Sequence, residues 1–114
     1  MNVSKQVYDA LTTLDYPVYQ DESKPSENAP ETYLTYKIVL EQPERAANNR
    51  PRALNSRVQV SMWSADPELT QGATLEVMAA MRDAGFLFIN AGGLPFNNGR
   101  FGWRGDYRIY NRME

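Results

Sequence analysis

The sequence predicts an α+β fold, a mainly antiparallel sheet of about four strands with two helices packed on it, in the order α-β-β-α-β-β. Two segments carry apolar side chains at helical spacing, and other segments alternate or concentrate apolar side chains as strands do. Because the predicted strands arrive in adjacent pairs, antiparallel pairing is the simplest arrangement. The length of 114 residues fits one domain that spans residues 1–114.

The two predicted helices have recognisable ends. Residues 3–14 repeat apolar side chains at helical spacing, and Asn2 is placed to cap the first turn. A proline at position 17 disfavours helical geometry in the residue before it, so this helix ends by that point. The second helix is expected from position 67 to about position 84. Asp66 is a good N-cap, a proline occupies the first helical position and Gly85 suits the end.

Alternation of apolar and polar side chains predicts the strands. Residues 32–41 and 54–64 alternate over most of their length, and residues 100–112 alternate again. Residues 86–89 form a short apolar run, and a brief extended piece is expected at residues 18–19. In the first of these strands the alternation directs four apolar side chains to one face: Leu34, Tyr36, Ile38 and Leu40.

Polar segments rich in proline, glycine and asparagine predict three long loops, at about residues 20–31, 42–53 and 91–99. The loop at 42–53 joins two predicted strands of a hairpin, whose connections usually have about two to five residues. An overlong connection of this kind is often functional. The glycines of the third segment indicate turn chemistry rather than a phosphate-binding loop, since a strand and not a helix follows them.

The composition excludes several classes of function. With no cysteine and no histidine, the chain has no disulfide, no Ser-His-Asp or Cys-His arrangement and no ordinary zinc site. The acidic residues lack the spacing of a calcium-binding loop, and a glycosidase carboxylate pair would need long-range convergence that no sequence reveals. We therefore expect no enzymatic activity, no cofactor and no bound metal.

Neither a membrane segment nor a secretory signal is expected. The longest apolar runs have only a few residues, far fewer than the roughly 20 that span a bilayer. The first residues lack the basic and apolar regions of a signal peptide, which predicts synthesis inside the cell.

The net charge of −2 is unevenly distributed along the chain. Residues 1–44 contain three lysines and eight acidic side chains, whereas residues 45–114 contain nine arginines and six acidic side chains. Either copies of the chain pair head to tail through these opposite charges, or the asymmetry is chance placement on a solvated surface, where salt screens it. The sequence leaves both interpretations open.

Four arginines in and beside the 42–53 segment are candidate contact residues: Arg45, Arg50, Arg52 and Arg57. Guanidinium groups suit phosphates and carboxylates, so three interpretations are open for this group: contact with nucleic acid, contact with another protein, or a solvated loop. A sequence pI of about 5.2 argues against a dedicated nucleic-acid binder, which usually carries a net positive charge.

Three apolar side chains are further candidates for an interface: Trp63, Leu94 and Phe96. Trp63 is on the polar face of its predicted strand, where it either packs against a neighbouring strand or protrudes. Leu94 and Phe96 lie in the third predicted loop, where they either fold into the core or present a contact to another chain. Aromatic residues and arginines are the types that most often anchor protein interfaces.

Several features occur together in one order. A short N-terminal helix is followed by a Tyr-Pro-Val-Tyr segment, an acidic proline-rich stretch and the motif Pro-Glu-Thr-Tyr-Leu. These segments are Tyr16-Pro17-Val18-Tyr19, Pro30-Glu31-Thr32-Tyr33-Leu34, the strand 56–64 that leads into Asp66-Pro67, and the closing strand 105–110. Over most of the chain this layout resembles the small tail-completion and tail-terminator (head–tail joining) proteins of long-tailed bacteriophages.

The resemblance implies a structural virion protein that forms a homo-oligomeric ring, commonly a hexamer, at the head-proximal end of the tail. Such a ring caps the tail tube, joins it to the head connector proteins and leaves a channel for DNA. The resemblance brings no catalytic residues. It implies a location in the virion tail, and in the host cytoplasm during assembly.

Within such a ring, the loops at 42–53 and 91–99 are expected to reach neighbouring subunits or the channel, where contact with passing DNA is non-specific. The alternative is a small monomeric module that binds nucleic acid or protein through the arginine-rich loop. The two hypotheses differ in a simple property, because the second predicts salt-sensitive binding that weakens when these arginines are removed.

Overall fold

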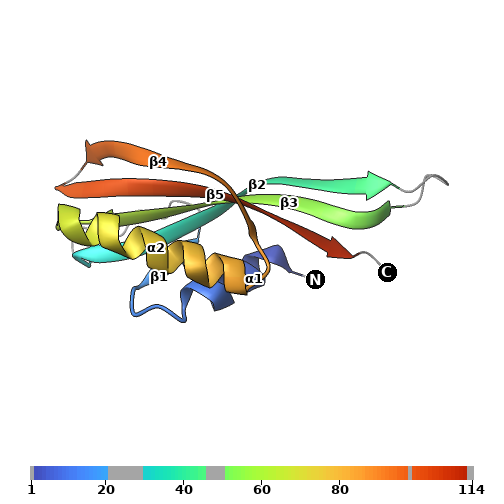
Figure 1. Ribbon diagram of the computed structural model, residues 1–114, viewed down its shortest axis with the longest axis horizontal. Helices are drawn as coiled ribbons and strands as arrows, with labels where there is room; N and C mark the ends of the chain where they lie inside the picture. Colours follow the sequence, from blue (N-terminus) through green and yellow to red (C-terminus); the bar gives the residue numbers. More distant parts are fainter. Residues whose placement is uncertain (1, 21–29, 46–50, 98, 113–114) are drawn as a thin grey trace.

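The computed structural model describes residues 2–20, 30–45, 51–97 and 99–112. In these described residues, two helices and five strands follow one another (Figure 1). They are α1 (Val3–Leu11), β1 (Val18–Gln20), β2 (Thr32–Arg45), β3 (Pro51–Ser64), α2 (Pro67–Asp83), β4 (Leu87–Asn97) and β5 (Arg100–Arg112).

The strands form one five-stranded sheet in the order β1-β2-β3-β5-β4. β1 is parallel to β2, whereas the other neighbours are antiparallel, so the sheet is mixed rather than purely antiparallel. Both helices lie on one face of the sheet (Figure 1). The α+β class and the two helices agree with the prediction. The expected number of strands was too low, because the brief extended piece after the first helix pairs with the sheet as β1.

The helix ends follow from local capping. The Asn2 side chain accepts a hydrogen bond from the Lys5 amide, and that of Asp66 accepts one from the Glu68 amide at 3.0 Å. α1 ends at Leu11, earlier than expected, because the last turn tightens into shorter-range bonds and the Thr13 hydroxyl donates to the Ala10 carbonyl at 2.7 Å.

The hydrophobic core lies between the two helices and the sheet. The helices contribute Val3, Val7, Ala10, Leu11, Ala73, Val77 and Met81, and the strands contribute Leu34, Tyr36, Val58, Val60, Met62, Tyr107 and Ile109, with Phe86 just before β4. Side-chain amides join α1 to the end of β5. Gln6 and Asn111 each donate to the other's carbonyl oxygen, at 3.1 and 2.8 Å.

The prediction for Leu40 was wrong. A register shift between Ile38 and Leu40 inserts one extra residue into β2, so that Ile38 pairs with Val58 but Leu40 pairs with Arg57. Because strand side chains alternate between faces, this bulge moves Leu40 from the core face to the opposite face. Its side chain is 40% exposed there.

Two of the three expected loops are largely strand. β2 continues to Arg45 and β3 begins at Pro51, so most of the 42–53 segment forms a hairpin arm that extends past the helices at the right of Figure 1. In β2 after the bulge, the described side chains of this arm are exposed. A strand of this kind shows no alternation of apolar and polar side chains in its sequence.

The 91–99 segment is likewise strand up to Asn97 and turns back at Gly99, whose φ of +76° favours glycine. Because glycine is uncommon in strands, the sequence of this segment does not predict a strand. Most of the 20–31 loop, residues 21–29, lies outside the described residues.

Candidate functional site

The sheet face that turns away from α1 and α2 carries two of the candidate contact residues, Arg57 and Trp63, and we call it the open face. Register and alternation assign its central side chains. From β2 they are Tyr33, Thr35 and Lys37; from β3 they are Arg57, Gln59, Ser61 and Trp63; from β5 they are Gly102, Arg104, Asp106 and Arg108. The sheet therefore brings cationic, neutral polar and aromatic side chains onto one surface.

Asp106 is the centre of a charged cluster on the open face. Arg57 Nη2 donates to Asp106 Oδ2 at 3.1 Å, and Arg104 Nε lies 3.5 Å from Asp106 Oδ1 in an ion pair. The Asp106 side chain is 4% exposed, whereas those of Arg57 and Arg104 are 35% and 39% exposed. Arg108 stands directly opposite Arg57 in the β3–β5 pairing. One buried carboxylate is thus paired with two guanidinium groups, and a third arginine lies on the same face beside Arg57.

Several buried polar atoms in this cluster lack hydrogen-bond partners. They include the Nε atoms of Arg57, Arg104 and Arg108 and the Oδ1 atom of Asp106. Oδ1 is within ion-pair distance of Arg104 but forms no hydrogen bond with it. The buried Nε atoms are out of reach of a ligand, but the side chains of Arg57 and Arg104 are 35% and 39% exposed, so their outer N–H groups can bind further anionic oxygens.

Tyr107 lies on the core-facing side of the same strand, β5. Its side chain is buried in the core, its ring meets Phe88 edge-on at 5.8 Å, and its hydroxyl has no hydrogen-bond partner. Burial raises the pKa of the Tyr107 phenol well above its ordinary value of 10.0, and the neighbouring charge of Asp106 adds to the effect. Tyr107 therefore stays neutral and is a core residue rather than an acid–base group.

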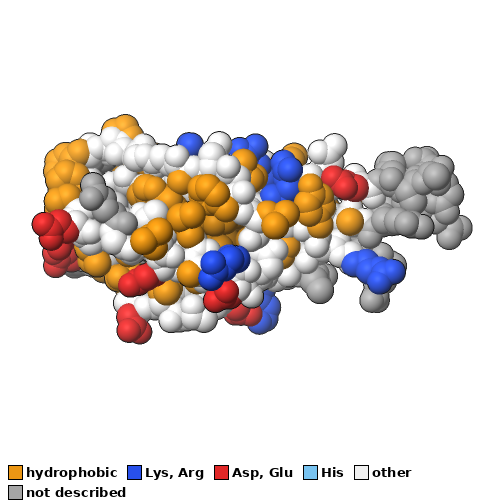
Figure 2. All heavy atoms as spheres, viewed as in Figure 1, with side chains coloured by type: hydrophobic (Ala, Val, Ile, Leu, Met, Phe, Trp, Pro, Cys, Tyr) orange, Lys and Arg blue, Asp and Glu red, His pale blue; other side chains and the backbone are white. Residues whose placement is uncertain are grey.

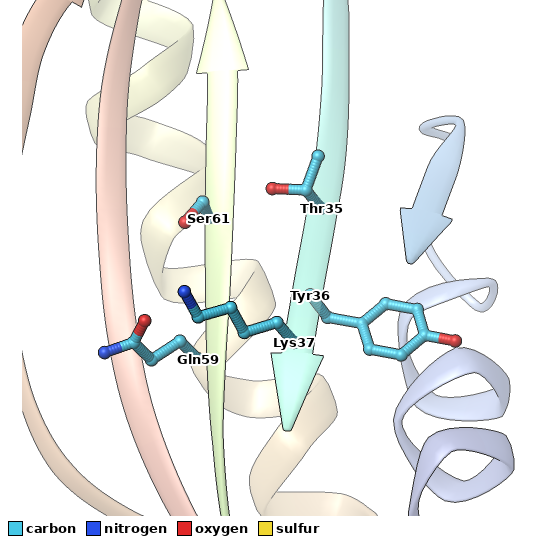
Figure 3. Close-up of a pocket in the computed structure, with 5 residues that line it drawn as sticks. All are labelled: Thr35, Tyr36, Lys37, Gln59 and Ser61. Carbon is cyan, nitrogen blue, oxygen red and sulfur yellow. The ribbon is translucent and has the colours of Figure 1, made fainter. Parts of the chain in front are cut away.

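A small hollow lies between β2 and β3 on the open face. In Figure 3, Thr35 and Lys37 project from β2 and Gln59 and Ser61 from β3, whereas Tyr36 points the other way, towards α1. There the Tyr36 hydroxyl lies 3.1 Å from that of Ser4. The hollow measures about 20 Å³, room for roughly one water molecule, and does not accommodate a metabolite. In the described part of the chain, no group of acidic side chains is arranged to hold a metal ion.

Trp63 packs across to β5 instead of protruding. Gly102 leaves the space for it, because a Cβ built on Gly102 would lie 2.6 Å from Cζ3 of the indole and 3.0 Å from Cβ of Leu94. Leu94 is half-buried beside this contact. Phe96 is 61% exposed, and its ring lies 4.9 Å from that of Phe101, centroid to centroid. Of the apolar candidates, Phe96 is the most accessible to another molecule.

The predicted arginine group is not a loop cluster. Arg57 lies in the middle of β3, bonded to Asp106. Arg45 and Arg52 belong to the hairpin arm, but their side chains and all of Arg50 lie outside the described part of the molecule. The sequence reasoning overlooked Arg104, Arg108 and Lys37, which strand pairing places near Arg57. The sequence signal for Arg104 and Arg108 was their position in an alternating strand, two residues before and two residues after an aspartate.

Among the described residues, charge also differs between the helices and the open face of the sheet. The two helices and the α2 cap carry mostly acidic residues, since Lys5 and Arg82 are outnumbered by Asp9, Asp66, Glu68, Glu76 and Asp83. The open face is cationic around Asp106. Because β2, from the acidic half, pairs with β3, from the basic half, the two chain halves do not form separate regions of the sheet. Head-to-tail pairing of copies through opposite charges stays a prediction.

Apolar side chains are exposed on the helix-bearing side and at one end of the sheet. Figure 2 shows orange side chains gathered over the middle of the molecule and at its left end, where β4 turns into β5. The most exposed large examples are Leu75 in α2, Leu87 at the start of β4 and Phe96 near its end, at 71%, 58% and 61%. Apolar exposure of this kind is typical of contact surfaces.

Comparison with known proteins shows a likeness of fold. No family model and no curated protein sequence matches the chain. Among solved structures, the chain is similar to one in the virion of a native gene transfer agent particle, with a TM-score of 0.59 and 15% sequence identity. The match covers 94% of this chain and 92% of that one. In the described residues, no helix has the length and apolar character needed to cross a membrane.

Proposed function

We propose that this chain is a structural virion protein of a phage or phage-like particle, and specifically a tail-completion or tail-terminator subunit. The observation that carries the proposal is the fold shared with a chain of a gene transfer agent virion, over nearly the full length of both. In this role the protein forms a homo-oligomeric ring, commonly of six copies, that caps the tail tube and joins it to the head connector. Its work is geometric, and no chemical step is required of it.

The edges of the sheet support assembly into larger structures. β4 is an edge strand whose first residues, Leu87 and Phe88, are exposed apolar side chains. At the other edge, β1 pairs only with residues 34–36 of β2 and leaves the rest of β2 without a neighbour on that side among the described strands. Unpaired strand edges readily add strands from another chain. Two different edges on opposite sides of one sheet suit the head-to-tail contact that closes into a ring.

The aromatic end of the sheet is a second element that suits assembly. Phe96 and Phe101 form an exposed pair where β4 turns into β5. Aromatic side chains that protrude together are common anchors of protein interfaces. We assign this pair to the contact with a neighbouring subunit or with the tail tube.

The proposal is tested by native mass spectrometry and negative-stain electron microscopy of the purified protein, alone and with the tail-tube protein of the same particle. Rings are expected in at least the second condition. Phe96→Lys should lower the ring population, because it places a charge in the contact, whereas Tyr8→Lys on α1, at a position 47% exposed, serves as the matched control. A protein that stays monomeric in both conditions contradicts the proposal.

A further inference from the structure

The cations of the open face are spread over three adjacent strands. Lys37 comes from β2, Arg57 from β3, and Arg104 and Arg108 from β5. With strands about 4.8 Å apart and about 3.3 Å per residue, this group spans on the order of 10 Å by 13 Å. Among the described side chains at the centre of this group, Asp106 carries the negative charge. The patch is wider than one carboxylate or one phosphate.

The buried carboxylate holds two of these guanidinium groups in place. Asp106 is bonded to Arg57 and ion-paired with Arg104, while both arginine side chains remain more than one-third exposed. Their inner Nε atoms are buried and unbonded, so one carboxylate does not satisfy them. Arginines fixed in this way lose little conformational entropy when a ligand binds their outer N–H groups, which favours binding.

The remaining side chains of the face distinguish between classes of ligand. Neutral donors from Thr35, Gln59 and Ser61 lie between the cations, and half-buried Tyr33 and Trp63 lie on the same face. No helix projects from this side of the described molecule (Figure 1). A broad cationic surface without a projecting helix matches a sugar-phosphate backbone, which presents one negative charge per about 1.7 Å of duplex axis.

We infer that the open face binds the phosphodiester backbone of duplex DNA without reading its sequence, through Arg57, Arg104, Arg108 and Lys37. This binding goes beyond the proposed structural role and does not depend on it, because one subunit carries the whole set of contacts. It shares Arg57 with the arginine group considered from the sequence, but its other three contacts come from β2 and β5. Asp106 orients the arginines and reduces the net charge, which keeps the binding weak and reversible.

The test is fluorescence anisotropy with a labelled 24-base-pair DNA duplex, titrated with the full-length protein at several salt concentrations. Three to four phosphate contacts predict a slope of about −3 for log K against log salt concentration. Arg108→Gln should lower affinity about fivefold to tenfold near 0.1 M salt and make the slope shallower by about one. Arg108→Lys keeps the charge and should retain most of the affinity.

Matched controls make the inference falsifiable. Arg82→Gln removes one positive charge from the exposed helix side, where Arg82 pairs with Asp83 at 3.6 Å, and should leave binding within twofold. Circular dichroism establishes that each variant is folded. The inference is overturned if Arg82→Gln weakens binding as much as Arg108→Gln, or if only a triple replacement of Arg45, Arg50 and Arg52 abolishes it. It is also overturned if polyglutamate competes as well as unlabelled DNA, because the face then fits acidic protein.

Discussion

Trp63 lies so close to Gly102 that the glycine has no room for a side chain. A Cβ at position 102 would lie 2.6 Å from Cζ3 and 2.8 Å from Cε3 of the indole. The contact joins β3 to β5 on the open face, where the two residues are directly paired. An aromatic side chain on the polar face of a strand is therefore accommodated within the subunit, by the absence of an atom on its neighbour.

Gly102→Ala tests this contact. The added methyl group must displace the indole or Leu94, and overpacking of this kind lowers the free energy of unfolding by roughly 1–3 kcal/mol. Urea denaturation measures the change. Gly92→Ala is the matched control, because it lies in the adjacent strand and a Cβ there meets nothing within 4 Å. Equal losses of stability in the two variants would show that replacing any strand glycine lowers the free energy of unfolding, and that the contact with the indole is not the cause.

Tyr107→Phe tests the buried, unbonded hydroxyl. Because burial without a hydrogen bond is unfavourable, its removal should leave the free energy of unfolding unchanged or raise it by up to roughly 1 kcal/mol near neutral pH. Thermal unfolding measured by circular dichroism is sufficient to detect this. A loss of more than roughly 1 kcal/mol would mean that the hydroxyl has a partner in solution, such as a buried water molecule.

The same residue predicts a pH dependence. The pKa of Tyr107 is raised in the folded protein, so its neutral form contributes stability that is fully present below the unfolded value of 10.0. This contribution is lost progressively as the pH rises above that value. Urea denaturation between about pH 8 and pH 11.5 should show an alkaline decline in the wild type that is smaller in Tyr107→Phe. Tyr110→Phe, at an exposed position, should follow the wild-type curve.

Asp106→Asn tests the charged cluster. The variant keeps the shape of the side chain but leaves the guanidinium groups of Arg57 and Arg104 without their carboxylate, and the free energy of unfolding should fall by roughly 1–3 kcal/mol. Solvent screening at the partly exposed arginines keeps the loss below that of a fully buried pair. Asp83→Asn is the control, because its ion pair with Arg82 is exposed and contributes little. Comparable losses in both variants would contradict the special role of Asp106.

Asp66→Ala tests the start of α2. The Asp66 carboxylate accepts the Glu68 amide at 3.0 Å, and its loss should lower the free energy of unfolding by roughly 1 kcal/mol. The Ser64 hydroxyl accepts the Asp66 amide at the same length, so the approach to the helix is held by a second bond. Asp66→Asn should restore most of the stability, because asparagine is an equally good cap. Denaturant titration of the two variants makes the comparison.

Features encoded within a few residues could be predicted from the sequence. The cap at Asp66, the stop at Gly85 and the alternating strand that ends at Ser64 all appear where they were expected. The candidate site was predictable only in part. Arg57 and Trp63 were named, but Arg104 and Arg108, more than 40 residues away in sequence, join them only through strand pairing. The described end of β2 in the hairpin arm is exposed on both faces, so it has no apolar alternation and its sequence predicts a loop.

By itself the sequence determined the α+β class, the helix starts and the absence of thiol and imidazole chemistry, because composition, capping and periodicity are properties of short segments. The tertiary structure decided which face each charge occupies. Pairing β2 with β3 and β3 with β5 gathers lysine and arginine side chains on the open face, and one bulge after Ile38 reverses the side on which Leu40 emerges. Register is set by long-range pairing, and a shift of one residue exchanges the two faces of a strand.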